Sequence, residues 1–156
     1  MAWLKELTTW EKQGPLLEPG FDLLKSKGVT KIGAIGFCWG AYGVLKLSAE
    51  KKIDVGVTCH PSLRIGQMFF EESEETQCSK AGCPIAFYPA GNDPNHYRDG
   101  TLAKIVEANG FECAAEDFPD MAHGWVPRGD TKDDKVSRDV KKCLESSTAF
   151  FDKYLK

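Results

Sequence analysis

Short apolar runs alternate along the chain with longer segments in which apolar residues recur every three or four positions. Four of these runs predict strands, and they lie in "KIGAIGF" (31–37), "DVGVTCH" (54–60), "CPIAFYPAGND" (83–93) and "FECAAEDFP" (111–119). Strands that alternate with helices favour a parallel sheet covered on both faces. We therefore expect an α/β fold with a parallel sheet of about four to five strands flanked by helices.

The helical segments are marked by apolar spacing near 3.6 and by the glycines that end some of them. Helices are predicted over residues 1–12, 17–28, 39–52 and 98–110, with a short one inside 62–75. The tail from Asp133 onward predicts one long helix with a single buried face. The residues of that predicted face are Val136, Val140, Leu144, Phe151 and Leu155.

The length of 156 residues fits a single domain, which we expect to span residues 1–156. The net charge of −3 offers no basic surface, which argues against nucleic acid as the main partner. The chain contains no apolar run near the roughly 18–20 residues that span a bilayer, and its start lacks the layout of a signal peptide. We therefore predict a cytoplasmic protein without a membrane partner. The acidic cluster "EESEE" (71–75) predicts a solvated face.

The six cysteines predict free thiols. They form no C-x-x-C pair and do not stand beside histidines at zinc spacing, so the pattern predicts no metal site. A chain of this length without a secretory signal is also expected to form no disulfides.

Residues with chemical function follow the predicted strands directly. Cys38 comes after the first strand, His60 after the second, Asp93 after the third and His123 after the fourth. In parallel sheets the reactive groups lie at the carboxyl ends of the strands. Cysteine, aspartate and histidine therefore occur in the chain order of an α/β-hydrolase triad, with a thiol in place of the serine hydroxyl.

The sequence around Cys38, "GFCWG", predicts a sharp turn from a strand into a helix. Glycines two positions before and after the thiol, Gly36 and Gly40, would let the backbone close without side-chain collision. The dipole of the following helix favours the thiolate. The amide of Trp39 would then face the oxyanion that forms when an ester is attacked.

His123 is the candidate general base toward Cys38, and a carboxylate would hold its other ring nitrogen. Two aspartates compete for that role, Asp93 and Asp120. We favour Asp93, because the loop after the third strand can reach across to the imidazole. Asp120 lies three residues before His123 and is expected to order its own turn.

Four segments, "GFCWGA", "HPS", "AGNDP" and "HGWVPRGD", resemble motifs of the dienelactone hydrolase family in the same order. The resemblance implies an α/β-hydrolase fold, a nucleophile at Cys38, its orienting aspartate at Asp93 and its base at His123. It implies hydrolysis of lactones or small carboxylic esters without metal or organic cofactor. It also implies that Arg128 contacts a substrate carboxylate. We expect His60 and Trp125 to line the same substrate site.

The segment before Cys38 is shorter than the family pattern, because only 37 residues precede the thiol. The usual N-terminal strands, which carry a second oxyanion amide, are therefore expected to be missing, giving a truncated α/β-hydrolase fold. Loss of one such donor costs about 10²–10³ in rate. The first strand would also lie at an open edge, which invites pairing with another chain. The alternative to an active hydrolase is thus a weak or inactive member that binds partners, including a homodimer across that edge.

Overall fold

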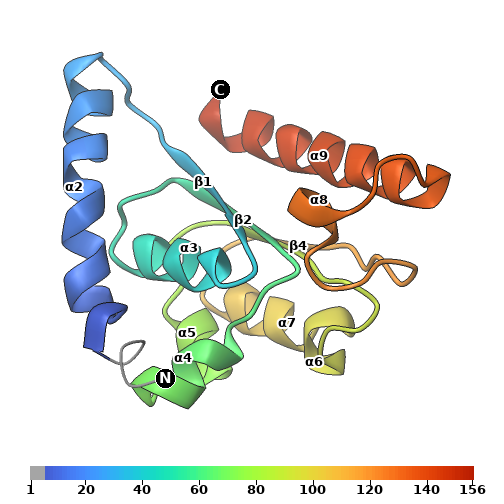
Figure 1. Cartoon of the computed structure of the whole chain (residues 1–156). Helices are drawn as coiled ribbons and strands as arrows, with labels where there is room; N and C mark the ends of the chain where they lie inside the picture. Colours follow the sequence, from blue (N-terminus) through green and yellow to red (C-terminus); the bar gives the residue numbers. More distant parts are fainter. Residues whose placement is uncertain (1–5) are drawn as a thin grey trace.

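The computed structural model describes residues 6–156, so the first five residues of the predicted N-terminal helix lie outside the described part (Figure 1). One parallel sheet organises the chain, with strand order β1-β2-β3-β4. The strands are β1 (Gly33–Phe37), β2 (Val55–Cys59), β3 (Ile85–Tyr88) and β4 (Cys113–Ala115). The predicted α/β fold with a parallel sheet is confirmed, and the described sheet has four strands.

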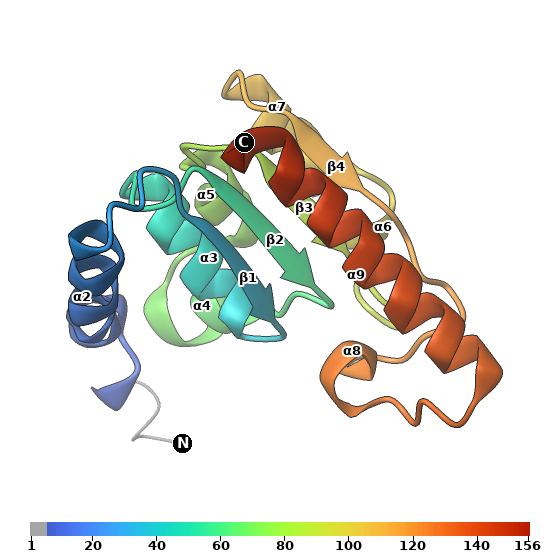
Figure 2. The same cartoon turned by 90° about the horizontal axis from the view of Figure 1, so that it is seen from above.

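Helices cover both faces of this sheet. From Trp10 onward the helices are α2 (Trp10–Ser26), α3 (Gly40–Ala49), α4 (Arg64–Phe70), α5 (Glu74–Ser79), α6 (Asn95–Arg98), α7 (Thr101–Ala108), α8 (Trp125–Arg128) and α9 (Asp134–Leu155). Helices α3 and α7 lie on one face, and α9 runs across the other (Figures 1 and 2). Each connection between successive strands therefore crosses over the sheet, as parallel strands require.

The two faces of the sheet belong to two separate hydrophobic clusters. Ile85 and Phe87 of β3 pack into the cluster on the α3 side, whereas Ala86 and Tyr88 pack into the cluster on the α9 side. Successive side chains of a strand point to opposite faces, so an uninterrupted apolar run is what a strand buried on both sides needs. This explains why the central strands read as continuous apolar runs.

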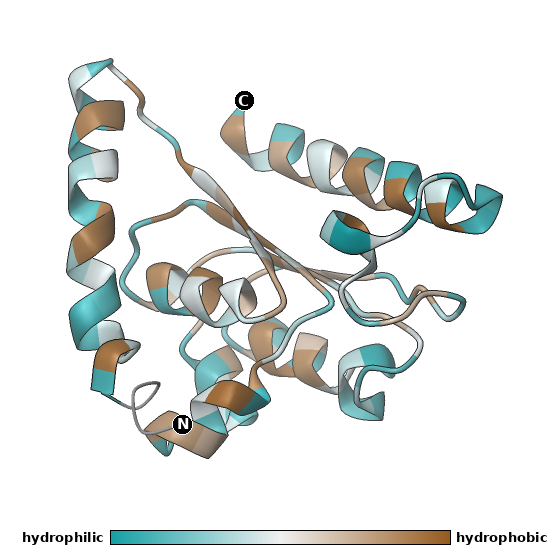
Figure 3. Ribbon diagram, viewed as in Figure 1, coloured by the Kyte–Doolittle hydropathy of each residue, from teal (hydrophilic) through white to brown (hydrophobic). Residues whose placement is uncertain are grey.

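Helix α9 is amphipathic, and Figure 3 shows hydrophobic and hydrophilic residues alternating along it. The prediction of Leu144 on its buried face is wrong, because that side chain is 44% exposed. The buried positions are Asp139, Cys143, Ser147 and Phe150. Leu144 follows the buried Cys143 by one residue, and this step turns its side chain about 100° around the helix axis, away from the buried face. None of the helices within residues 6–156 has both the length and the apolar character to cross a bilayer.

Helix α2 begins earlier than the predicted segment 17–28 and continues through Pro15 and Pro19. A proline inside a helix removes a backbone hydrogen bond and costs about 3 kcal/mol. Burial of Phe21 in the hydrophobic core anchors α2 and offsets part of this cost. A partly exposed ion pair between Glu18 and Lys52, with 2.6 Å between carboxylate oxygen and Nζ, adds little to it.

The prediction that the acidic cluster 71–75 forms a solvated face is wrong for two of its four glutamates. Glu72 and Glu74 are buried. Glu72 pairs with Lys46 at 2.8 Å and with Lys80 at 3.0 Å, and Glu74 pairs with His96. Lys46 lies far from the cluster in sequence, and the two lysines offset the cost of taking the Glu72 carboxylate out of water.

Strand β1 forms one edge of the described sheet, as predicted. Its central side chain, Ile35, is 38% exposed. Helix α2 lies beside this edge and carries further exposed apolar side chains (Figures 2 and 3). Those of α2 are Leu16, Leu17, Leu23 and Leu24.

Candidate active site

The turn between β1 and α3 holds Cys38 in the left-handed region, with φ of 55°. Its amide donates to the carbonyl of Cys59 at 3.1 Å, so the turn is tied to the end of β2. A Cβ on Gly36 would lie 2.4 Å from the backbone carbon and oxygen of Gly40, whereas a Cβ on Gly40 would meet nothing within 4 Å. The close approach of the two glycines therefore demands glycine at position 36 alone.

Three of the predicted side chains meet above the carboxyl ends of the strands. His123 Nε2 lies 3.1 Å from the Cys38 sulfur. His123 Nδ1 lies 2.6 Å from a carboxylate oxygen of Asp93. Asp120 instead faces Arg138, with 3.5 Å between Oδ2 and the guanidinium. Of the two competing aspartates, the fold brings Asp93 to the imidazole.

The loops that carry Asp93 and His123 are bonded to each other. The second carboxylate oxygen of Asp93 accepts from the amide of Ala90 at 2.8 Å. The side-chain oxygen of Asn92 accepts from the amide of His123 at 2.6 Å. These bonds orient both members of the pair before any ligand is present, which is the preorganisation that proton transfer requires.

The electrostatics of the pair favour its charged form. Burial raises the pKa of the Cys38 thiol, but hydrogen bonds with Ser62 and His123 and the charge of His123 lower it by more. Burial lowers the pKa of His123, whereas its bonds to Cys38 and Asp93 bring it above its ordinary value. A lowered thiol pKa beside a raised imidazole pKa stabilises a thiolate facing an imidazolium.

Ser62 also belongs to this cluster, although we did not predict it as a site residue. Its hydroxyl lies 3.3 Å from the Cys38 sulfur and 3.2 Å from His123 Nε2. The only sequence signal was its place in "HPS", directly after the turn that ends β2. Serine is too common at turns for that place to mark it.

His60 does not offer a surface to substrate, contrary to the prediction. Its side chain is fully buried, and its ring lies edge-on to His123 with 4.9 Å between centroids. Burial and the neighbouring charge of His123 lower the pKa of His60 to about 4, so the ring is neutral near pH 7. Neither ring nitrogen has a hydrogen-bond partner among the described residues. His60 therefore supports the His123 ring from behind.

Trp125 and Arg128 lie beyond His123 on α8. The indole of Trp125 is buried against Phe118, with 4.6 Å between ring centroids. Both residues border a hollow of about 550 Å³ that His123 also lines. The exposed guanidinium of Arg128 lies against Gly124. A Cβ added to this glycine would come within 2.1 Å of the guanidinium. The guanidinium of Arg128 is therefore accessible to a substrate, in keeping with the prediction. Trp125 is buried and shapes the hollow mainly from within the core.

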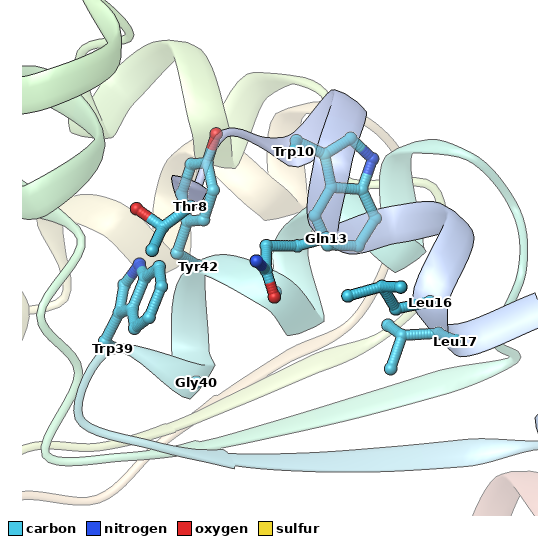
Figure 4. A pocket seen from close by; sticks show the side chains of 9 residues that line it. Thr8, Trp10, Gln13, Leu16, Leu17, Trp39, Gly40 and Tyr42 are labelled. Atoms are coloured by element: carbon cyan, nitrogen blue, oxygen red, sulfur yellow. The ribbon is translucent and has the colours of Figure 1, made fainter. Parts of the chain in front are cut away.

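On the other side of Cys38, Trp39 ends a smaller hollow of about 210 Å³ between α2 and α3. Figure 4 shows its ring facing that hollow, with Trp10 and Leu16 of α2 on the far side. The backbone amide of Trp39 helps to lower the pKa of the Cys38 thiol. Within residues 6–156, no group of three or more histidine, cysteine, aspartate or glutamate side chains is placed to hold a metal ion.

The parallel sheet with helices on both faces superposes on two solved structures. The acylaminoacyl peptidase of Pyrococcus horikoshii superposes with a TM-score of 0.65 at 14% identity, over 86% of this chain and 26% of that one. A Klebsiella pneumoniae protein provisionally named a dienelactone hydrolase superposes with a TM-score of 0.59 at 16% identity, over 78% of this chain and 52% of that one. Likenesses at such identities establish the fold alone.

Residues 18–155 match the sequence model of the dienelactone hydrolase family, and the chain belongs to that family. Hydrolase tropI of Talaromyces stipitatus is 27% identical over 150 residues. This alignment covers 94% of the present chain and 55% of tropI, so the chain spans about half the length of this curated relative.

Proposed function

We propose that this chain carries the nucleophilic centre of a hydrolase that cleaves small carboxylic esters or lactones. Cys38 is the nucleophile, His123 the general base and acid, and Asp93 the residue that orients His123. The main support for this proposal is a continuous line of contacts through the imidazole of His123. Its Nε2 lies 3.1 Å from the Cys38 sulfur, and its Nδ1 lies 2.6 Å from the Asp93 carboxylate. Membership of the dienelactone hydrolase family supports the reaction class.

In the proposed reaction the Cys38 thiolate attacks the carbonyl carbon, and the π electrons of the carbonyl move to its oxygen. When this intermediate collapses, His123 gives its Nε2 proton to the departing alkoxide and an acyl thioester remains on the sulfur. Water then attacks the carbonyl carbon of the thioester, while His123 takes a proton from this water molecule. The tetrahedral intermediate that forms then collapses, which releases the carboxylic acid and restores the Cys38 thiolate.

The amide of Trp39 is the proposed donor to the oxyanion. It belongs to the residue directly after the nucleophile, and its lowering of the pKa of the Cys38 thiol supports a position beside the sulfur. Arg128 is the proposed contact for a substrate carboxylate, since its guanidinium is exposed at the hollow that His123 lines. A carboxylate in the substrate would form a charge-assisted pair with this group.

Replacing Asp93 with asparagine is expected to raise the pH at which Cys38 becomes reactive. In the native chain the midpoint of alkylation by iodoacetamide should lie below the value of about 8.5 for a free thiol. The carboxylate raises the pKa of His123, so without it the imidazole loses its proton at lower pH and supports the thiolate less. The midpoint is read from alkylation rates of the Cys38 peptide between pH 5 and pH 10.

Asp120→Asn is the matched control, because it removes the competing carboxylate that faces Arg138 instead. Its midpoint should equal that of the native chain. A shift in the Asp120 variant without a shift in the Asp93 variant would reverse the assignment of the orienting aspartate.

The exposed edge of the sheet favours a second candidate function, association with a partner chain through β1. The motivating observation is that Ile35 stays 38% exposed on a strand that pairs on one side only. Sedimentation analysis over a 100-fold range of concentration, chosen to cover weak dimers, should show the mass rising toward that of a dimer. The Ile35→Lys variant should be more monomeric than the native chain at the same concentration. A constant monomer mass in the native chain would reject this candidate.

A further inference from the structure

The hydroxyl of Ser62 lies close to two members of the proposed triad, and the proposed reaction gives it no role. Its hydroxyl oxygen, the Cys38 sulfur and His123 Nε2 form a triangle with sides of 3.3, 3.2 and 3.1 Å. Ser62 as a whole residue is only 4% exposed, so water does not compete freely for its hydroxyl. A buried hydroxyl normally finds partners, and here both partners are the reacting groups themselves.

The backbone holds Ser62 in this position. Its amide donates to the carbonyl of Cys38 at 3.0 Å, and its carbonyl accepts from the amide of Ile65 at 3.2 Å. Cys38 in turn donates its amide to Cys59 at the end of β2. Since Ser62 follows β2 by three residues, the elbow and the serine are fastened to the same strand end. The distance between hydroxyl and sulfur is therefore set by the fold and not by a mobile loop.

The charges of the pair decide what the hydroxyl does. A thiolate is an acceptor only, and an imidazolium nitrogen is a donor only. In the thiolate–imidazolium form of the pair, the single hydroxyl proton of Ser62 would point to the sulfur of Cys38, and its oxygen would accept from the Nε2–H group of His123. Both bonds are charge-assisted, and such bonds are stronger than bonds between neutral groups.

We propose that Ser62 is a further catalytic residue of this site, a hydroxyl donor that holds the Cys38 thiolate and the His123 imidazolium together before attack. This inference rests on the proposed function, because it gives Ser62 a role in the same reaction. Once the sulfur carries an acyl group it is a poor acceptor, and rotation of the hydroxyl alone redirects its proton toward the neutral Nε2. No heavy atom has to move, because the oxygen is nearly equidistant from both partners.

The test compares Ser62→Ala with the native chain in the pH dependence of Cys38 alkylation by iodoacetamide, followed by mass spectrometry of the Cys38 peptide. Loss of the donor should raise the midpoint by about 1 pH unit and lower the rate at neutral pH by about 10-fold. Ser62→Thr keeps the hydroxyl and should return the midpoint toward the native value. Other ionisable groups close to the pair, Asp93 and His60, are unchanged in both variants.

Ser48→Ala is the matched control. Ser48 is also buried and its hydroxyl lies 3.0 Å from a sulfur, that of Cys83, which is not part of the active site. Its loss should leave the Cys38 midpoint unchanged. A serine variant that merely loosened the fold would lower the melting temperature without a selective change at Cys38, so melting curves accompany each profile.

The inference is overturned if Ser62→Ala and the native chain share the same midpoint. It is also overturned if the native midpoint lies at the ordinary value of about 8.5, since no thiolate would then be stabilised. Ester hydrolysis is measured separately. A selective shift in Ser62→Ala together with no hydrolysis by the native chain would uphold the role of Ser62 toward the pair and reject the proposed reaction.

Discussion

Alanine at position 38 is expected to reduce ester hydrolysis to the uncatalysed rate, a fall of about 10³-fold or more from the native chain. The sulfur is the proposed attacking atom, and no acyl intermediate can form once it is removed. The measurement is the release of p-nitrophenolate from p-nitrophenyl acetate at neutral pH. The native chain should also show a burst, because thioester formation precedes the slower attack by water.

Cys113→Ala is the matched control for this experiment. Cys113 is a partly buried thiol on β4, and its sulfur faces the backbone carbonyl of Ala114. Its replacement removes one thiol without touching the contacts between Cys38 and His123. Equal rates for the native chain and Cys38→Ala would refute the hydrolase proposal, whatever the Cys113 variant does.

The largest effect on stability is expected from Gly36→Ala. The added methyl carbon would lie 2.4 Å from two backbone atoms of Gly40 and 2.8 Å from the amide nitrogen of Ala41. Backbone atoms at this turn cannot move aside as a flexible side chain would. We expect a loss of about 3 kcal/mol or more, the upper end of the overpacking range. For a chain of this size that corresponds to a fall in melting temperature of about 6–12 °C.

Gly40→Ala adds the same methyl group four residues later, at a position with no atom within 4 Å. Gly40 is the first residue of α3, where alanine is a better helix former than glycine. The melting temperature should therefore stay unchanged or rise slightly. Equal destabilisation by the two substitutions would show that the close approach at Gly36 does not decide the turn, and circular dichroism during heating distinguishes the two outcomes.

Much of the fold was predictable because it depends on local pattern. Apolar runs between helical segments predicted the four parallel strands, and the described part of the chain contains them in that order. The spacing of glycines around Cys38 predicted the turn, although the structure requires only Gly36 to be glycine. The strand ends then identified Cys38, Asp93 and His123 as candidates for one site, because parallel strands bring their carboxyl ends to a common edge.

Other features depend on partners that are distant in sequence, and no local pattern marks them. Glu72 and Glu74 read as part of a charged surface, but Lys46, Lys80 and His96 let them be buried. The buried face of α9 required the exact rotation of a helix against a sheet, which placed Cys143 inside and Leu144 outside.

By itself, the sequence determined the strand and helix alternation, the strained turn at Cys38 and the order of the candidate groups, because each follows from spacing and residue type within a short segment. Only the tertiary structure decided that Asp93 and not Asp120 faces His123, and that the hydroxyl of Ser62 lies beside both Cys38 and His123. Those choices depend on distances of a few ångströms between loops that follow different strands. Such distances are set by the packing of the whole sheet and not by any one segment.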